Sequence, residues 1–124
     1  MEDGVSFFFD SYALIEIFKG SKSYHQYREN KIVTSYAHLY ETYYILRQFF
    51  SEQEIENYFI HLQKFCISLK FSWIKEATEF RLENKRKELS YADCLGYIIS
   101  KELNIRFLTG DHQFKSLPNV EYIK

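Results

Sequence analysis

Four acidic residues stand where a short α/β chain could bring them together. Asp10 directly follows a short apolar run near the start of the chain, and Asp111 comes three residues after another such run. Glu41 and Asp93 each fall in the first turns of segments with helical apolar spacing. Carboxylates crowded into one site repel one another and take up protons unless cations offset their charge. Mg²⁺ and Mn²⁺ accept sets of oxygen ligands, so these four residues are candidate ligands for such a cation.

Each of these acids also has an ordinary structural explanation. Asp10 could cap the helix that follows it, and Glu41 could be one surface glutamate among many. Asp93 lies three residues after Ser90, which is the spacing of a capping box at a helix start. Asp111, in Thr-Gly-Asp, is a natural turn residue. The coincidence of all four in this order favours one shared site.

The elements that must position these acids follow from apolar spacing and from residues that start or stop helices. We expect strands at 5–9, 31–34, 66–71, 105–108 and 120–123. We expect helices at 12–19, 35–50, 51–65, 73–82 and 90–103. Gly20 and Asn104 suit left-handed helix ends, and Ser51 with Glu54 forms a capping box. Strands that alternate with helices in one short chain predict the α/β class, a sandwich with a mainly parallel sheet.

Such a sheet has a preferred place for ligands. In an open parallel sheet the ligand crevice lies outside the carboxyl ends of the strands. Asp10 and Asp111 follow two predicted strands, so both would open into one crevice if those strands are neighbours. Glu41 and Asp93 would join them if both of their helices start at the rim, and small Ala37, one turn before Glu41, leaves room. The sequence therefore predicts four carboxylates that converge from four separate places in the chain.

Composition bounds the class of protein. A chain of 124 residues with 46% hydrophobic residues fits one domain, spanning 1–124. Its acidic start is unlike a signal peptide, and no window approaches the ~18 apolar residues of a membrane-spanning helix. Cys66 and Cys94 lack CxxC spacing and are interpreted as reduced thiols of a cytoplasmic protein. If metal holds four acids, the 13 that remain face 16 basic residues, a balance suited to a phosphate backbone.

Three sequence segments carry a family resemblance. The first is a strand followed by Asp10-Ser11 and then Leu14-Ile15, and the second is Thr34-Ser35 leading to Glu41 on a tyrosine-rich helix. The third and most specific is Leu-Ser-Tyr-Ala-Asp at 89–93, then a helix, then Leu-Thr-Gly-Asp at 108–111 with Phe114. With these motifs the chain resembles the PIN-domain family, closest to the VapC toxins of prokaryotic toxin–antitoxin pairs. The resemblance runs over nearly the whole chain.

The resemblance implies a fold, an activity and partners. It implies a PIN-like three-layer α/β/α sandwich and a metal-dependent endoribonuclease that cleaves RNA. Asp10, Glu41, Asp93 and Asp111 would hold Mg²⁺ or Mn²⁺, which polarises the scissile phosphate and lowers the pKa of a bound water. Ser11 and Thr109 would support the site. A homodimer and a small antitoxin protein are the implied partners.

Other readings of the family resemblance stay open. Some family members carry a further acid two residues after the last motif aspartate, where this chain has Gln113. The sequence therefore leaves open whether the site binds one metal ion or two. The alternatives to a toxin are a PIN nuclease in RNA processing and a PIN scaffold that no longer cleaves RNA.

Some other residues that could bind ligands have simpler explanations. His38 and His112 suggest zinc, but the chain has no HExxH and no paired-cysteine spacing. The cluster Lys85-Arg86-Lys87 is interpreted as solvated, with RNA contact as the alternative. Tyr12, Tyr24 and Tyr27 could stack on bases, although packing is favoured.

The many aromatic residues and one glycine also lead to expectations. The excess of Phe and Tyr suggests a homodimer interface on the helices at 36–50 and 55–65. Gly96 should cost its helix roughly 1 kcal/mol relative to alanine.

Overall fold

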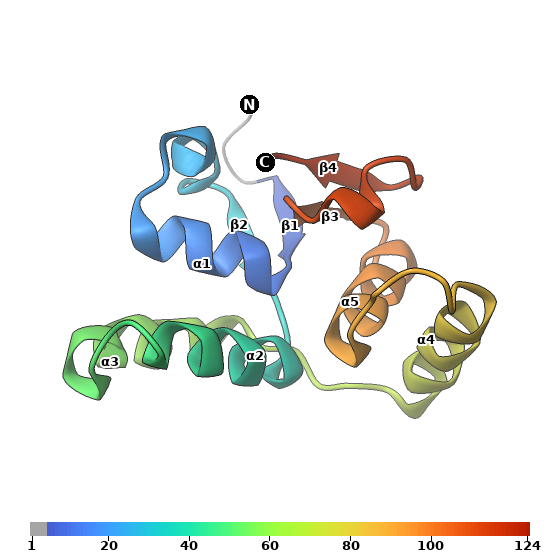
Figure 1. The fold of residues 1–124 in the computed structure, drawn as a ribbon, viewed down its shortest axis with the longest axis horizontal. Helices are drawn as coiled ribbons and strands as arrows, with labels where there is room; N and C mark the ends of the chain where they lie inside the picture. The colour runs from blue at the N-terminus through green and yellow to red at the C-terminus, as the bar shows by residue number, and fades with distance from the viewer. Residues whose placement is uncertain (1–4) are drawn as a thin grey trace.

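The chain forms one parallel sheet with helices on both faces. A computed structural model describes residues 5–124 and shows this arrangement (Figure 1). The strands lie in the order β2-β1-β3-β4 and all neighbours are parallel. They are β1 (Ser6–Phe9), β2 (Lys31–Val33), β3 (Arg106–Thr109) and β4 (Val120–Tyr122). The central pair joins the two ends of the chain, since Phe8 is in register with Phe107. The predicted α/β class with a parallel sheet is confirmed.

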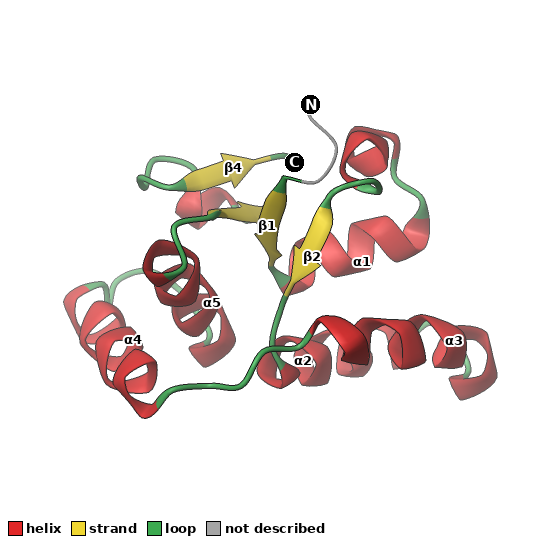
Figure 2. Ribbon diagram, turned by 180° about the vertical axis from the view of Figure 1, so that it is seen from behind, coloured by secondary structure: helices red, strands yellow, loops and turns green. Residues whose placement is uncertain are grey.

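The helices form two layers around this sheet (Figure 2). One layer contains α1 (Ser11–Lys19), α2 (Tyr36–Arg47) and α3 (Glu52–Leu62), and the other contains α4 (Phe71–Glu83) and α5 (Tyr91–Glu102). Short 3₁₀ turns are η1 (Lys22–Tyr27), η2 (Gln63–Phe65) and η3 (His112–Phe114). Successive side chains of β1 point to opposite faces, so Phe7 and Phe9 pack in the first layer and Phe8 in the second. The predicted three-layer sandwich is therefore confirmed.

Local signals in the sequence set most helix ends. Gly20 ends α1 with a φ of 74°, and Asn104 follows α5 with a φ of 57°, as the left-handed position requires. Ser51 and Glu54 form a complete capping box at the start of α3. Ser90 and Asp93 form another at the start of α5. These short-range interactions hold the first turn of α5 in place, and that turn carries one of the candidate acids.

Two predictions about elements were wrong. Residues 66–71 do not form a strand: Cys66 makes a single bridge to Thr34, and Phe71 already starts α4. This segment carries the chain from the layer of α2 and α3 to that of α4 (Figure 2), so its alternating apolar residues do not line a sheet face. The helical spacing at 90–103 also predicts that Leu103 lies on the buried face of its helix, but α5 ends at Glu102, and Leu103, its C-cap residue, is 40% exposed.

Three further expectations have outcomes in the structure. Both cysteines are free. Within residues 5–124, no helix has the length and apolar character needed to cross a membrane. The acidic start, residues 1–4, lies outside the described part of the chain.

The apolar face expected on α2 is only partly covered, because Leu39 and Leu46 are buried whereas Tyr36 and Tyr40 are exposed.

Candidate functional site

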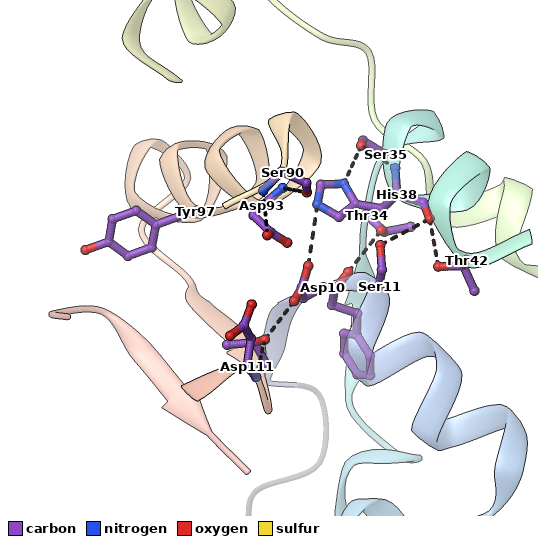
Figure 3. Close-up of polar contacts among 12 residues, drawn as sticks. Asp10, Ser11, Thr34, Ser35, His38, Thr42, Ser90, Asp93, Tyr97 and Asp111 are labelled. Atoms are coloured by element: carbon purple, nitrogen blue, oxygen red, sulfur yellow. Dashed lines mark hydrogen bonds and ion pairs between the residues drawn. The ribbon is translucent and has the colours of Figure 1, made fainter. Parts of the chain in front are cut away.

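Asp10 lies at the carboxyl end of β1, at the centre of the polar residues in Figure 3. Its side chain is buried, with 2% of the residue exposed. Oδ2 accepts a 2.7 Å hydrogen bond from the Thr109 hydroxyl at the end of the neighbouring strand β3. Asp10 is the N-cap residue of α1 but makes no capping hydrogen bond through its side chain, so the capping explanation is wrong. Oδ1 is buried and has no hydrogen-bond partner.

Two more carboxylates meet Asp10 from helices of the two layers. Glu41 extends from the second turn of α2, and Asp93 extends from the first turn of α5. One oxygen of each lies within 4.8 Å of the others, which makes these three residues a group able to contact one cation. Asp93 also caps α5, since Oδ2 accepts from the Ser90 backbone N–H at 2.9 Å. Asp93 thus forms the predicted capping box and also lies within the group of three carboxylates.

Asp111 lies in the same cleft but outside this group of three. The cleft has a volume of about 590 Å³ and is lined by all four predicted acids. The Thr109 hydroxyl, which donates to Asp10, accepts from the backbone N–H of Asp111 at 3.1 Å. Asp111 Oδ1 accepts from the backbone N–H of Gln113 at 3.0 Å, which is the predicted turn interaction. Thr109 therefore connects the two aspartates that follow β1 and β3.

Burial and mutual repulsion make these carboxyl groups hard to ionise. Burial raises the pKa of Asp10 well above its usual range, and the charges of Asp93 and Glu41 raise it further. Burial likewise raises the pKa of Asp93 to about 6, with Glu41 and Asp111 adding to the shift and the Ser90 hydrogen bonds opposing it. A divalent cation would remove this penalty. The buried, unpartnered Asp10 oxygen, together with two nearby carboxylates, fits such an ion.

The sequence suggested zinc for His38 but missed its contact with Asp10. The ring is fully buried, packs edge-on against Phe8 at 4.8 Å, and binds the Ser35 hydroxyl through Nδ1 at 2.7 Å. Nε2 lies 3.8 Å from Asp10 Oδ1, too far for a hydrogen bond. Burial lowers the pKa of His38 to about 3, although the Ala92 carbonyl opposes this, so the ring is neutral. The signal available in the sequence was its place three residues after the N-cap Ser35 and three before Glu41.

The zinc interpretation finds no support in the geometry. Across residues 5–124, the one group of at least three potential metal ligands contains carboxylates only. The His112 side chain is 85% exposed beside Asp111, and His38 is buried next to Asp10 but is not part of the group of three. An all-oxygen group favours Mg²⁺ or Mn²⁺ over zinc.

Gln113 stands where some PIN-domain proteins have another acid, and it has a structural role. Its Oε1 accepts from the backbone N–H of Glu88 at 2.5 Å, and its Nε2 donates to the carbonyl of the same residue at 2.8 Å. Lys87 Nζ donates to the Gln113 carbonyl at 2.8 Å. The side chain thus fixes the loop before Ser90. Glu88 is exposed and is a further carboxylate that lines the cleft.

The remaining predicted residues are placed as follows. Ser11 is buried beside Asp10, and its hydroxyl donates to the His38 carbonyl at 3.4 Å. Tyr24 and Tyr27 are buried and donate to Ile123 and Glu121, which confirms packing over base stacking for both. Tyr12 is partly exposed along the cleft. Its ring lies where a side chain on Gly110 would be, so glycine is required there.

Comparison with known proteins assigns the family. Residues 7–120 match the model of the PIN domain, and the chain belongs to the PIN-domain family. Its fold is similar to a chain of a toxin–antitoxin complex from Klebsiella pneumoniae, with a TM-score of 0.74, 18% identity, and 93% of this chain and 95% of that chain covered. It is also similar to a chain of VapBC2 from Rickettsia felis bound to a DNA fragment from their promoter, with a TM-score of 0.67, 20% identity, and coverages of 97% and 100%. At these identities the two likenesses show a common fold. No curated protein matches the chain in sequence.

Proposed function

We propose that this chain is a metal-dependent endoribonuclease that hydrolyses RNA phosphodiester bonds. The observation that carries the proposal is that Asp10, Glu41 and Asp93 each bring one oxygen within 4.8 Å of the others, while Oδ1 of Asp10 is buried without a hydrogen-bond partner. That oxygen costs free energy unless a ligand satisfies it, and the raised pKa values of Asp10 and Asp93 describe the same cost. Membership of the PIN-domain family supports a nuclease.

Each of the four acids has a part in this proposal. Asp10, Glu41 and Asp93 hold Mg²⁺ or Mn²⁺, and Asp111 acts at the rim of the same cleft. The cation supplies positive charge that polarises the phosphate and lowers the pKa of water. Thr109 keeps Asp10 and Asp111 aligned through its two hydrogen bonds. Ser11 supports the site from behind through the His38 carbonyl.

A cleavage assay with matched variants tests the activity. Wild type should cleave single-stranded RNA or tRNA with Mg²⁺ or Mn²⁺ and stop in excess EDTA, while DNA serves as the substrate control. Asp10→Asn, Asp93→Asn and Asp111→Asn should each abolish cleavage and keep the fold. Glu88→Gln is the matched control, because its exposed side chain lies in the same cleft outside the group of three. Near-normal turnover by any two of the aspartate variants at saturating Mn²⁺ would refute these roles.

The biological role proposed for the nuclease is that of a VapC-type toxin with a small antitoxin partner. Both similar structures come from toxin–antitoxin complexes, which supports this role. We expect the partner to place a basic side chain, such as arginine, against the carboxylates and so compete with metal. Cleavage should then fall with partner concentration, and added Mn²⁺ should restore it.

Expression in a bacterial host tests the toxin role separately. Wild type should arrest growth and degrade cellular RNA, whereas Asp93→Asn should do neither at equal protein level. Equal growth of both strains with intact RNA would remove the toxin role. The cleavage assay would then decide between a nuclease of RNA processing and a binding module.

A further inference from the structure

Two buried polar atoms that form no hydrogen bond face each other at the proposed metal site. They are Oδ1 of Asp10 and Nε2 of His38, 3.8 Å apart (Figure 3). Both residues are almost completely enclosed, with exposures of 2% and 0%. Burying a polar atom without a partner costs about 1–3 kcal/mol, so such a pair calls for an explanation.

His38 is held in this position from several sides. Its backbone carbonyl accepts hydrogen bonds from the hydroxyls of Thr42, at 2.7 Å, and Ser11, at 3.4 Å. The ring packs against Phe8, and a Cβ on residue 96 of α5 would lie 2.6 Å from Nε2. Glycine at position 96 therefore leaves the space that the ring occupies. The side chain cannot rotate away from Asp10 without displacing α5 or β1.

The Ser35 hydroxyl determines which ring nitrogen carries the proton. Ser35 Oγ is the N-cap acceptor of α2 and receives the backbone N–H of His38. Of the two partners of this buried hydroxyl, the backbone N–H can only donate, so the hydroxyl directs its own proton to Nδ1, 2.7 Å away. The ring proton is then on Nε2, which lies 3.8 Å from Asp10 Oδ1, and the Ala92 carbonyl is a second acceptor near the ring. Beside an ionised Asp10, as in the metal-bound site, the opposite tautomer would place two lone pairs against each other in a buried space.

We infer that His38 is a positioning residue for the metal centre, whose Nε2–H holds Oδ1 of Asp10 while Thr109 holds Oδ2. This inference rests on the proposed metal-dependent function. A movement of roughly 1 Å brings the 3.8 Å pair into hydrogen-bonding range. With one protein donor at each oxygen, the plane of the carboxylate is fixed, and each oxygen keeps a further lone pair for the cation. Partners of this kind typically change metal affinity by about 10–100-fold.

Variants at position 38 test this role without any RNA. His38→Gln keeps an N–H close to the Nε2 position, whereas His38→Leu keeps the bulk without a donor. We expect His38→Leu to weaken Mn²⁺ binding by about tenfold, measured by titration with electron paramagnetic resonance. His38→Gln should stay within about threefold of wild type, and His61→Leu, an exposed histidine on α3, should match it. Melting curves in EDTA report whether each variant is folded.

The tautomer is measured in the wild-type protein, so this part of the test is independent of how the variants fold. Nitrogen-15 NMR of the histidine rings should show His38 protonated at Nε2, in EDTA as well as with Mg²⁺. A ring protonated at Nδ1 would overturn the inference. Equal Mn²⁺ affinity of wild type and folded His38→Leu, or equal losses in the Gln and Leu variants, would also overturn it. Absence of Mn²⁺ binding by wild type would instead refute the proposed function.

Discussion

Replacing Gly96 with alanine should destabilise the protein, although alanine is the better helix former. Helix propensity alone predicts a gain of about 1 kcal/mol for this change in the middle of α5. The new methyl group would lie 2.6 Å from His38 Nε2 and 2.8 Å from ring carbons of Phe8 and Phe107. All three neighbours are fully buried, so none can move into solvent. Overpacking of this kind costs about 1–3 kcal/mol.

The balance of these two effects sets the expected magnitude. Because three contacts are shorter than 3.0 Å, the overpacking cost lies at the upper end of its range. A net loss of about 1–2 kcal/mol remains after the gain in helix propensity, which lowers the Tm of a chain of 124 residues by roughly 5 °C. Melting curves followed by circular dichroism in EDTA measure this shift without the contribution of bound metal.

A second background shows whether His38 is the neighbour that matters. In His38→Ala protein the closest of the three contacts is gone, so Gly96→Ala should cost at least about 0.5 kcal/mol less than in wild type. Two results would refute the reasoning. One is a higher Tm for Gly96→Ala alone, and the other is an equal cost of the change in both backgrounds.

Three more perturbations follow from the structure. In the folded protein without metal the pKa of Asp93 is raised to about 6. Protonated Asp93 therefore adds to the free energy of unfolding below about pH 4, and this contribution is lost as the pH rises through 6. We therefore compare the free energies of unfolding in urea of Asp93→Asn and wild type at pH 4.5 and 7.5. The difference in favour of the variant should be larger by roughly 1–2 kcal/mol at pH 7.5, and the same difference at both pH values contradicts this. Gln113→Glu should lower the Tm by several degrees, since it removes the N–H that binds the Glu88 carbonyl, and an increase would contradict the bond's role. One exposed groove is lined by Tyr40, Tyr44 and Tyr91, and we expect a homodimer that forms through it. The double variant Tyr40→Glu, Tyr44→Glu should be a monomer. A wild-type mass of 15.1 kDa by light scattering at micromolar concentration would contradict the dimer.

The convergence of the acids was predictable because it depends on sheet topology. Asp10 and Asp111 follow strands that the apolar runs made visible, and parallel neighbours place their carboxyl ends at one edge. Ser90 and Asp93 could be placed from the capping signal alone. These are local patterns or direct consequences of them. The prediction that four carboxylates share one cleft was correct, and three of them each have an oxygen within 4.8 Å of the others.

What the sequence did not predict depends on packing between layers. The alternating residues at 66–71 follow the pattern of a strand, and only the position of α4 shows that no sheet face is available to them. His38 comes close to Asp10 because α2 and β1 pack together, a contact between residues far apart in the chain. Gly96 has a similar explanation, since the sequence gives the cost to the helix but not the ring that fills the space. Side-chain contacts across layers have no periodic signal.

The pairing of β1 with β3 has a consequence for how the chain matures. Asp10 and Asp111 become neighbours only when residues 7–9 pair with residues 106–108, and the Thr109–Asp10 bond spans 99 positions. During synthesis, Asp10 and Glu41 are made long before the second half of their site exists. Contacts of such long range also form late in folding, because the entropy of closing the intervening chain must be overcome first. A nascent or interrupted chain that ends before β3 therefore lacks the assembled carboxylate group, and the complete cleft forms only after β3 and Asp111 have been made.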